Sequence, residues 1–200
     1  MNVDRLEIVQ KVGSHLAAHP NATLPIIAER LGMTEQAIEN ALHEIEGLSF
    51  QEFRANRQLE QAFKQLGEIS IAANGPWEAT RARRRLIIPK ATVKYRIRSF
   101  WNRETDYSNQ CPLVDISRDG LAFLADQDPG HKKRISMLLK LPGEEGALQI
   151  EGRIMYAVAT GIAGFRYRIG VQFSPFSEKR GHNTPKALNA LARIEEIYFP

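Results

Sequence analysis

The stretch RARRRLIIPKATVKYRIRSFWNRETDYSNQCPLVDISRDG, residues 81–120, holds the two motifs on which the fold and the function of this chain depend. It opens with four arginines in five positions and closes with Asp115, Ser117 and Gly120 in the spacing D-x-S-x-x-G. Between the motifs, residues 92–98 alternate between apolar and polar side chains, which predicts a strand with one buried face. A cationic segment, a strand and a polar turn therefore follow one another.

The two motifs combine side chains that suit a guanine nucleotide. An arginine donates two parallel hydrogen bonds to a phosphate or to the O6/N7 edge of guanine, and its flat face stacks on a purine. Asp115 offers acceptors for guanine N–H groups, Ser117 offers a hydroxyl, and Gly120 lets the backbone approach a ligand closely. The structural alternative for the second motif is a hairpin whose turn ends in a left-handed glycine.

The order of these motifs resembles that of a PilZ domain. An R-x-x-x-R element, Arg81 to Arg85, is followed by a strand, by D-x-S-x-x-G and later by a closing strand, YRIGVQF, at residues 167–173. The resemblance covers about residues 81–176. PilZ domains are receptors for the bacterial second messenger cyclic di-GMP, so the resemblance implies a barrel that supplies the aspartate and the serine, and a flexible arginine arm that wraps the dinucleotide.

The resemblance carries over to six ligand-binding positions, with one departure in the arm. Many members have paired arginines at the start of the first motif, whereas here Ala82 follows Arg81, so the register of the arm is left open and Arg84 is included as a substitute. The implied cyclic di-GMP ligands are Arg81, Arg84, Arg85, Asp115, Ser117 and Gly120.

The residues before the arginines have the spacing of four helices. Apolar positions recur at helical intervals from residue 4 to 19, from 24 to 31, from 35 to 46 and on through Leu66, with Thr23 and Thr34 as N-caps and glycines 32 and 47 at two helix ends. The second and third predicted helices form a helix-turn-helix. Residues 4–67 are similar to one half of an AraC-type DNA-binding domain.

Two observations oppose DNA binding by this helical region. The helix that would enter the major groove, residues 34–46, carries four glutamates, whereas affinity for DNA comes mainly from neutralising phosphates. The AraC family has two helix-turn-helix units, and only one is present here. We therefore expect a protein-interaction or dimerisation module, with DNA binding as the alternative.

The remaining elements predict an α+β protein. Strand-like runs at residues 113–117, 121–124, 134–141, 148–156 and 167–173 join the one at 92–98, and residues 185–198 have helical spacing. Short strands with turn punctuation indicate an antiparallel barrel or sandwich, and the PilZ resemblance favours a six-stranded β-barrel with a C-terminal helix. The expected domains are a helical domain, 1–70, a linker with the arginine arm, 71–85, and the barrel with its helix, 86–200.

Composition narrows the classes of function. Residues 1–75 carry a net charge of −4 and residues 76–200 a net charge of +8, so an anion is steered to the second half.

We expect a cytoplasmic protein, because no apolar run approaches the roughly 18–20 residues of a membrane span and no signal-peptide pattern begins the chain. The single cysteine, Cys111, excludes an internal disulfide and Cys-x-x-Cys sites. No catalytic motif occurs, so we expect neither an enzyme nor a cofactor or metal.

The sequence thus predicts a cyclic di-GMP receptor. Nucleotide binding to the barrel and the arm is expected to change the disposition of the helical domain, which then signals to a protein partner. Two alternatives remain: a cyclic di-GMP-responsive DNA-binding regulator, and a PilZ-fold interaction module that binds no nucleotide. An oligomer is compatible with the sequence.

Overall fold

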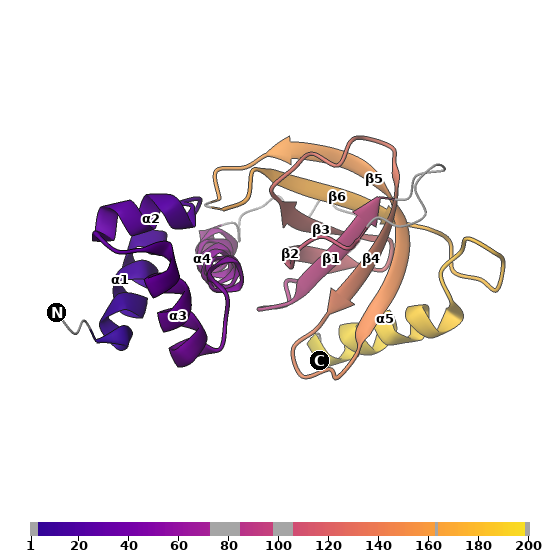
Figure 1. The fold of residues 1–200 in the computed structure, drawn as a ribbon. Helices are drawn as coiled ribbons and strands as arrows, with labels where there is room; N and C mark the ends of the chain where they lie inside the picture. Colours follow the sequence, from indigo (N-terminus) through magenta and orange to yellow (C-terminus); the bar gives the residue numbers. More distant parts are fainter. Residues whose placement is uncertain (1–3, 73–84, 98–105, 163, 199–200) are drawn as a thin grey trace. The chain divides into compact units, whose positions relative to one another are not determined.

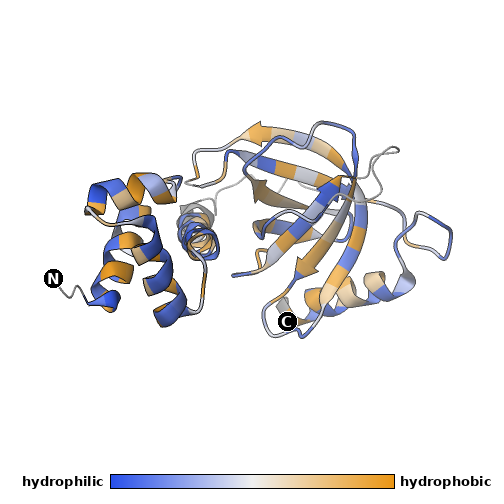
Figure 2. Ribbon diagram, in the orientation of Figure 1, coloured by the Kyte–Doolittle hydropathy of each residue, from blue (hydrophilic) through white to orange (hydrophobic). Residues whose placement is uncertain are grey.

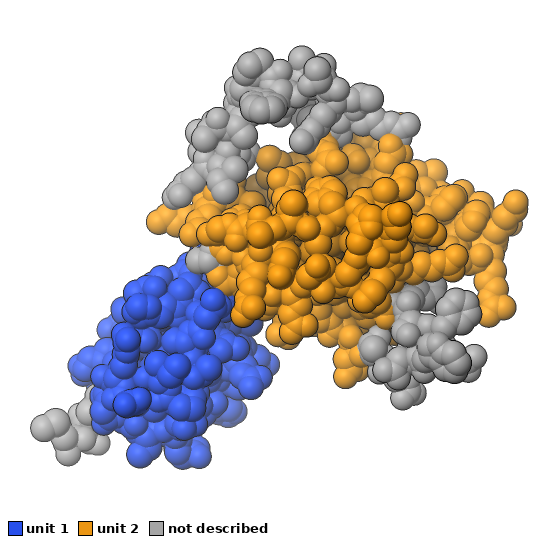
Figure 3. All heavy atoms as spheres, turned by 90° about the horizontal axis from the view of Figure 1, so that it is seen from above, with its two compact units in different colours: residues 1–62 blue, residues 63–200 orange. Residues whose placement is uncertain are grey.

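The computed structural model describes residues 4–72, 85–97, 106–162 and 164–198. Within these ranges, four helices precede a closed six-stranded antiparallel barrel, and a fifth helix follows it (Figure 1), so the predicted α+β class and order of elements are confirmed. The chain divides into two compact units, Met1–Ala62 and Phe63–Pro200 (Figure 3). We call them the helical unit and the barrel unit.

The helices begin and end where the sequence supplies capping residues. The Asp4 carboxylate accepts a hydrogen bond from the Leu6 amide at 3.1 Å, and the Thr34 hydroxyl accepts one from the Ala37 amide at 3.2 Å. Ser49 and Glu52 form a capping box, in which the Ser49 amide donates to Glu52 at 2.9 Å. The helices are α1 (Arg5–Ala18), α2 (Leu24–Leu31), α3 (Glu35–Glu46) and α4 (Phe50–Ala72).

The helical unit has a core of its own, which α4 completes. Its largest buried side chains include Leu16, Ile27, Ile38 and Leu42, at the helical spacing seen in the sequence. Polar side chains of α4 satisfy backbone carbonyls beyond the end of α1, where a helix leaves acceptors without partners. Gln58 Nε2 donates to the Pro20 carbonyl at 2.8 Å.

Six antiparallel strands close the barrel in the order β1-β2-β3-β6-β5-β4. Apolar and polar residues alternate along parts of residues 92–97 and 147–159 (Figure 2), as expected for strands with one face toward a core, whereas residues 121–125 are buried without interruption. The strands are β1 (Thr92–Ile97), β2 (Cys111–Ser117), β3 (Gly120–Ala125), β4 (Arg134–Lys140), β5 (Ala147–Ala159) and β6 (Tyr167–Phe173).

The barrel core and helix α5 (Pro185–Tyr198) share one apolar cluster. Phe123, Ile135 and Met137 are fully buried inside the barrel, and Leu191 and Ile194 of α5 pack into the same cluster. Arg118, in the β2–β3 turn, forms an ion pair with Glu195 of α5 at 2.7 Å. The C-terminal helix is therefore held both to the core and to the turn of the D-x-S-x-x-G motif.

Two elements extend beyond their predicted limits. Helix α4 continues to Ala72, past Gly67, and β5 continues to Ala159, whereas the sequence pattern ended at Tyr156. A register shift between Ile154 and Tyr156 changes the face toward which the later residues of β5 point, which breaks the alternation used to predict the strand. None of the helices in the described ranges has the length and apolar character needed to cross a membrane.

Candidate functional site

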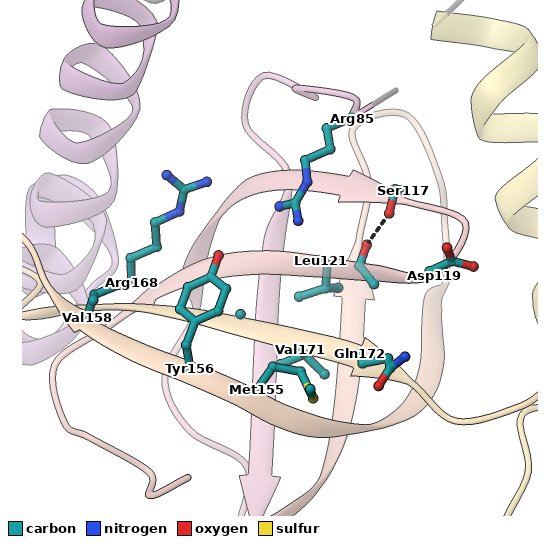
Figure 4. Close-up of a pocket in the computed structure, with 12 residues that line it drawn as sticks. Arg85, Ser117, Asp119, Leu121, Met155, Tyr156, Val158, Arg168, Val171 and Gln172 are labelled. Carbon is teal, nitrogen blue, oxygen red and sulfur yellow. Dashed lines mark hydrogen bonds between the residues drawn. The ribbon is translucent and has the colours of Figure 1, made fainter. Parts of the chain in front are cut away.

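The D-x-S-x-x-G motif forms the β2–β3 hairpin turn, and Gly120 is required there for space. Ser117 Oγ donates a hydrogen bond to the Gly120 carbonyl at 3.2 Å (Figure 4). A Cβ on Gly120 would lie 2.1 Å from the Val171 carbonyl oxygen of β6. The expected left-handed glycine is wrong, because Gly120 is not among the glycines with positive φ. Close approach of β6 to the turn, rather than turn conformation, excludes a side chain at this position.

Asp115 is the centre of a buried charge cluster. Its side chain is 8% exposed, Oδ1 accepts from Arg85 Nη1 at 2.6 Å, and Oδ2 accepts from Arg168 Nη2 at 2.6 Å. A buried carboxylate is stable only when its charge is paired and hydrogen-bonded. With two arginines on one aspartate, the cluster keeps a net positive charge.

A short backbone pairing places Arg85 at this cluster. The Leu86 amide donates to the Ile116 carbonyl at 2.7 Å, and the Ile116 amide donates back at 2.9 Å. Burial alone would lower the pKa of the Arg85 guanidinium, but Asp115 and the Tyr156 hydroxyl outweigh it and raise the pKa. Arg85 therefore stays charged beside the aspartate. Arg81 and Arg84 lie outside the described residues, so their placement remains a prediction.

Among the residues of the site that were not predicted from the sequence, Tyr156 and Arg168 interact with the predicted residues Arg85 and Asp115. The Tyr156 ring lies against Gly170, where a Cβ would be 2.1 Å from ring atom Cε1. Arg168 Nε is buried and makes no hydrogen bond within the described part of the chain. The glycine inside the closing strand YRIGVQF was the available signal, since a glycine in a strand often marks close approach of another group.

These residues surround a pocket of about 770 Å³ (Figure 4), which we call the arginine pocket. The guanidiniums of Arg85 and Arg168 provide positive charge, and exposed Met155 and Val158 of β5 provide an apolar wall. The structure brings Arg85, Ser117 and Gly120 to the lining, with Asp115 directly behind Arg85. The lining consists of Arg85, Ser117, Asp119, Gly120, Leu121, Met155, Tyr156, Val158, Arg168, Gly170, Val171 and Gln172.

The pocket can hold a ligand that is both anionic and flat. Arginine forks bind phosphate oxygens in pairs and stack on planar rings, and the tyrosine and the apolar wall offer further contact area for a ring. In the described ranges, no group of three or more His, Cys, Asp or Glu side chains is arranged to hold a metal ion.

Comparison with known families identifies this barrel. The model of the PilZ domain matches residues 80–186, more than half of the chain. The chain belongs to the PilZ domain family. The PilZ match begins one residue before Arg81 and includes the whole arginine pocket.

Solved structures are similar to parts of this PilZ protein at low sequence identity. The Bacillus subtilis inhibitor of motility MotI/DgrA is 14% identical with a TM-score of 0.40, over 60% of this chain and 54% of that chain. The K. pneumonia MrkH–c-di-GMP complex is 20% identical with a TM-score of 0.40, over 58% of this chain and 50% of that chain. The matched regions thus span about half the length of those proteins. The search of curated proteins found no match.

Two of the four glutamates of α3 form contacts within the helical unit. Glu39 Oε2 accepts a hydrogen bond from the Phe50 amide at 3.0 Å, which caps α4, and Glu44 pairs with Arg5 of α1. Glu35, Glu44 and Glu46 are exposed on α3. The ion pair with Arg5 offsets the charge of Glu44, so the net negative charge on this surface is smaller than the sequence implied.

Proposed function

We propose that this PilZ protein is a receptor for cyclic di-GMP and signals through its helical unit. The observation that carries the proposal is the Arg85–Asp115–Arg168 cluster, whose two arginines line the arginine pocket, with each ion pair at 2.6 Å. Arg85, the last residue of the R-x-x-x-R element, lines this pocket together with Ser117 and Gly120 of D-x-S-x-x-G, and the chemistry of both motifs suits guanine and phosphate. Arg81, Arg84 and Arg85 would hold phosphate and base, and Asp115, Ser117 and Gly120 would meet the base edge.

The charge cluster prepares the pocket for this ligand. Without ligand, Asp115 holds the guanidiniums of Arg85 and Arg168 in place, so less side-chain entropy is lost when phosphate binds. Each guanidinium has five N–H donors, and one bond to Asp115 leaves the others for the ligand. Arg168 Nε, buried without a partner in the described structure, gains an acceptor when an anion enters.

Signalling would follow from ordering of the arginine arm. The arm precedes Arg85 in the chain and joins the barrel to the helical unit, so a ligand that binds the arm biases the arrangement of the two units. A coupling free energy of about 1–3 kcal/mol is typical of such links. The helical unit is proposed to contact a protein partner. The alternative is a ligand-responsive DNA contact by α2 and α3, which would resemble the AraC half-domain.

Calorimetric titration of the full chain tests this function, with cyclic di-GMP as ligand and GTP as control. We expect micromolar or tighter binding that weakens at least about a hundredfold in Arg85→Ala, because a charge-assisted bidentate contact is lost. Arg193→Ala is the matched control, since Arg193 is an exposed arginine of α5 that does not line the pocket. Equal affinity in the wild type and Arg85→Ala would show that the assigned site is wrong.

The same samples distinguish the two signalling outputs. Fluorescence anisotropy of labelled duplex DNA, with and without cyclic di-GMP, should show weak binding that high salt abolishes and that the ligand leaves unchanged. Ligand-dependent, sequence-selective binding would instead favour the DNA-binding alternative.

A further inference from the structure

The barrel has a second cavity, of about 500 Å³, and five of its thirteen lining residues are basic. We call it the basic cavity. It shares Met155 and Gln172 with the arginine pocket, but none of the residues proposed to bind cyclic di-GMP lines it. Among the described lining residues, Glu151 is the one carboxylate. The basic lining residues are His131, Lys132, Arg134, Arg153 and His182.

Two arginines of this cavity face each other across the sheet. Arg134 of β4 and Arg153 of β5 are direct partners in the strand register, and both are exposed. Like charges directly opposite in an antiparallel pair destabilise a sheet. Neither guanidinium has a hydrogen bond or ion pair with another side chain in the part of the chain that the structure describes. An anion between them would turn this repulsion into attraction.

The loop that carries Lys132 is held in an unfavourable conformation. Lys132 has a φ of 60°, a left-handed value that side chains other than glycine seldom adopt. Two hydrogen bonds to β5 maintain it: the Lys132 amide donates to the Ile154 carbonyl at 2.9 Å, and the Ile154 amide donates to the Lys133 carbonyl at 3.0 Å. Strain of this kind often accompanies a functional site, and here it fixes a lysine at the cavity.

Hydrogen bonds of Asn183 anchor the segment of the lining that contains His182. Asn183 is 3% exposed and bonds to β5 in both directions: its Oδ1 accepts from the Glu151 amide at 2.7 Å, and its Nδ2 donates to the Glu151 carbonyl at 2.9 Å. Beside it, His182 Nδ1 lies 2.7 Å from Ser177 Oγ. These bonds orient the His182 ring, so basic groups from two hydrogen-bonded segments line the cavity.

We propose that the basic cavity binds the phosphate groups of a small di- or triphosphate-bearing ligand. Two arginine forks and a lysine match adjacent phosphates, each of which offers several acceptor oxygens. A cavity of about 500 Å³ encloses a molecule of that size, whereas a duplex or an extended acidic peptide would contact only its rim. This proposal does not depend on cyclic di-GMP binding in the arginine pocket.

The test is calorimetric titration of the full chain with tripolyphosphate at about 0.15 M ionic strength, where exposed charges are screened beyond roughly 8 Å. We expect saturable one-to-one binding that weakens at least about tenfold in R134Q/R153Q. The matched control, K94Q/K140Q, removes the same charge from exposed strand residues that do not line the cavity, and it should stay within about twofold of the wild type. Absence of saturation, or equal weakening in both double variants, would overturn the proposal.

Three further measurements separate the phosphate contacts from effects of folding, of the arginine pocket and of general charge. The melting temperature of R134Q/R153Q should not fall, because the substitution removes a repulsion; a fall would attribute weaker binding to unfolding and contradict the role assigned to the pair. Arg85→Ala should retain tripolyphosphate binding, and R134Q/R153Q should retain cyclic di-GMP binding. Each proposed site can then be disproved without affecting the other. One-to-one binding of a hexaglutamate peptide or a short duplex as tight as that of tripolyphosphate would contradict the phosphate assignment.

Discussion

The helical unit and the barrel unit use their polar side chains differently. In the helical unit, Gln58 and Gln61 donate to backbone carbonyls, and the Arg5–Glu44 ion pair lies at the surface with side chains 54% and 53% exposed. In the barrel unit, the Asp115 side chain is 8% exposed and its arginine partners reach the pocket. The first unit thus uses its polar groups for its own fold, whereas the second holds charge where a ligand can reach it.

The largest expected effect comes from Gly120→Ala. The new Cβ would lie 2.1 Å from the Val171 carbonyl oxygen, a backbone atom that cannot turn away. We expect the free energy of unfolding to fall by about 3 kcal/mol or more, at the upper end of overpacking effects. Urea unfolding followed by circular dichroism measures it.

Gly146→Ala is the control for this substitution. Gly146 lies just before β5, and a Cβ added there would meet no atom within 4 Å, so alanine should leave the unfolding free energy nearly unchanged. Similar stability of the two variants would mean that the barrel yields at the motif turn and that its close contact with β6 is not rigid.

A smaller effect separates the buried ion pairs from the exposed one. Asp115→Ala leaves two guanidiniums without their buried partner, and we expect a loss of about 2 kcal/mol in unfolding free energy together with weaker cyclic di-GMP binding. Glu44→Ala removes a half-exposed partner, and its expected loss is about 0.5 kcal/mol or less. Equal losses of unfolding free energy in the two variants, measured by urea unfolding, would contradict the expected difference between the buried and the exposed ion pairs.

The smallest expected effect is a pH dependence in the helical unit. Burial, aided by Arg30 and His19, lowers the pKa of His15 below its ordinary value of 6.5. As the pH falls below about 6.5, the unfolded chain takes up a proton at this position before the folded chain does, so stability declines until the folded pKa is passed. Stability at pH 7 minus that at pH 5 should therefore be smaller in His15→Gln than in the wild type. An unchanged difference, with the His15 ring titrating normally by NMR, would contradict this.

Local pattern predicted most of the fold. Alternation at residues 92–98 and apolar runs between turn signals located the six strands to within three residues at each end, and capping residues such as Thr34 marked helix ends, because these signals act between near neighbours in the chain. The spacing of Asp115, Ser117 and Gly120 could be recognised for the same reason, since they lie within six positions around one hairpin, and their role as ligand-binding residues stays a prediction.

The remaining site residues depend on contacts that local pattern does not contain. Arg168 meets Asp115 across 53 positions of sequence, and they come together because β3 pairs with both β2 and β6. Tyr156 follows a register shift in β5, so its direction cannot be counted from the start of the strand. Alternation of apolar and polar residues shows that a strand has two faces, but it does not show which side chains line a pocket.

The single cysteine, Cys111, lies at the short pairing between β1 and β2, and its reactivity can report on opening of the barrel there. Among the described residues, the paired register of β1 and β2 covers Thr92–Pro112 and Val93–Cys111, whereas that of β1 and β4 covers six positions. Burial raises the pKa of the Cys111 thiol to about 12, so in the closed barrel it is neutral and shielded. Alkylation of Cys111 therefore requires β1 and β2 to separate. Its rate would measure how often the barrel opens locally at this pairing, without any label added to the chain.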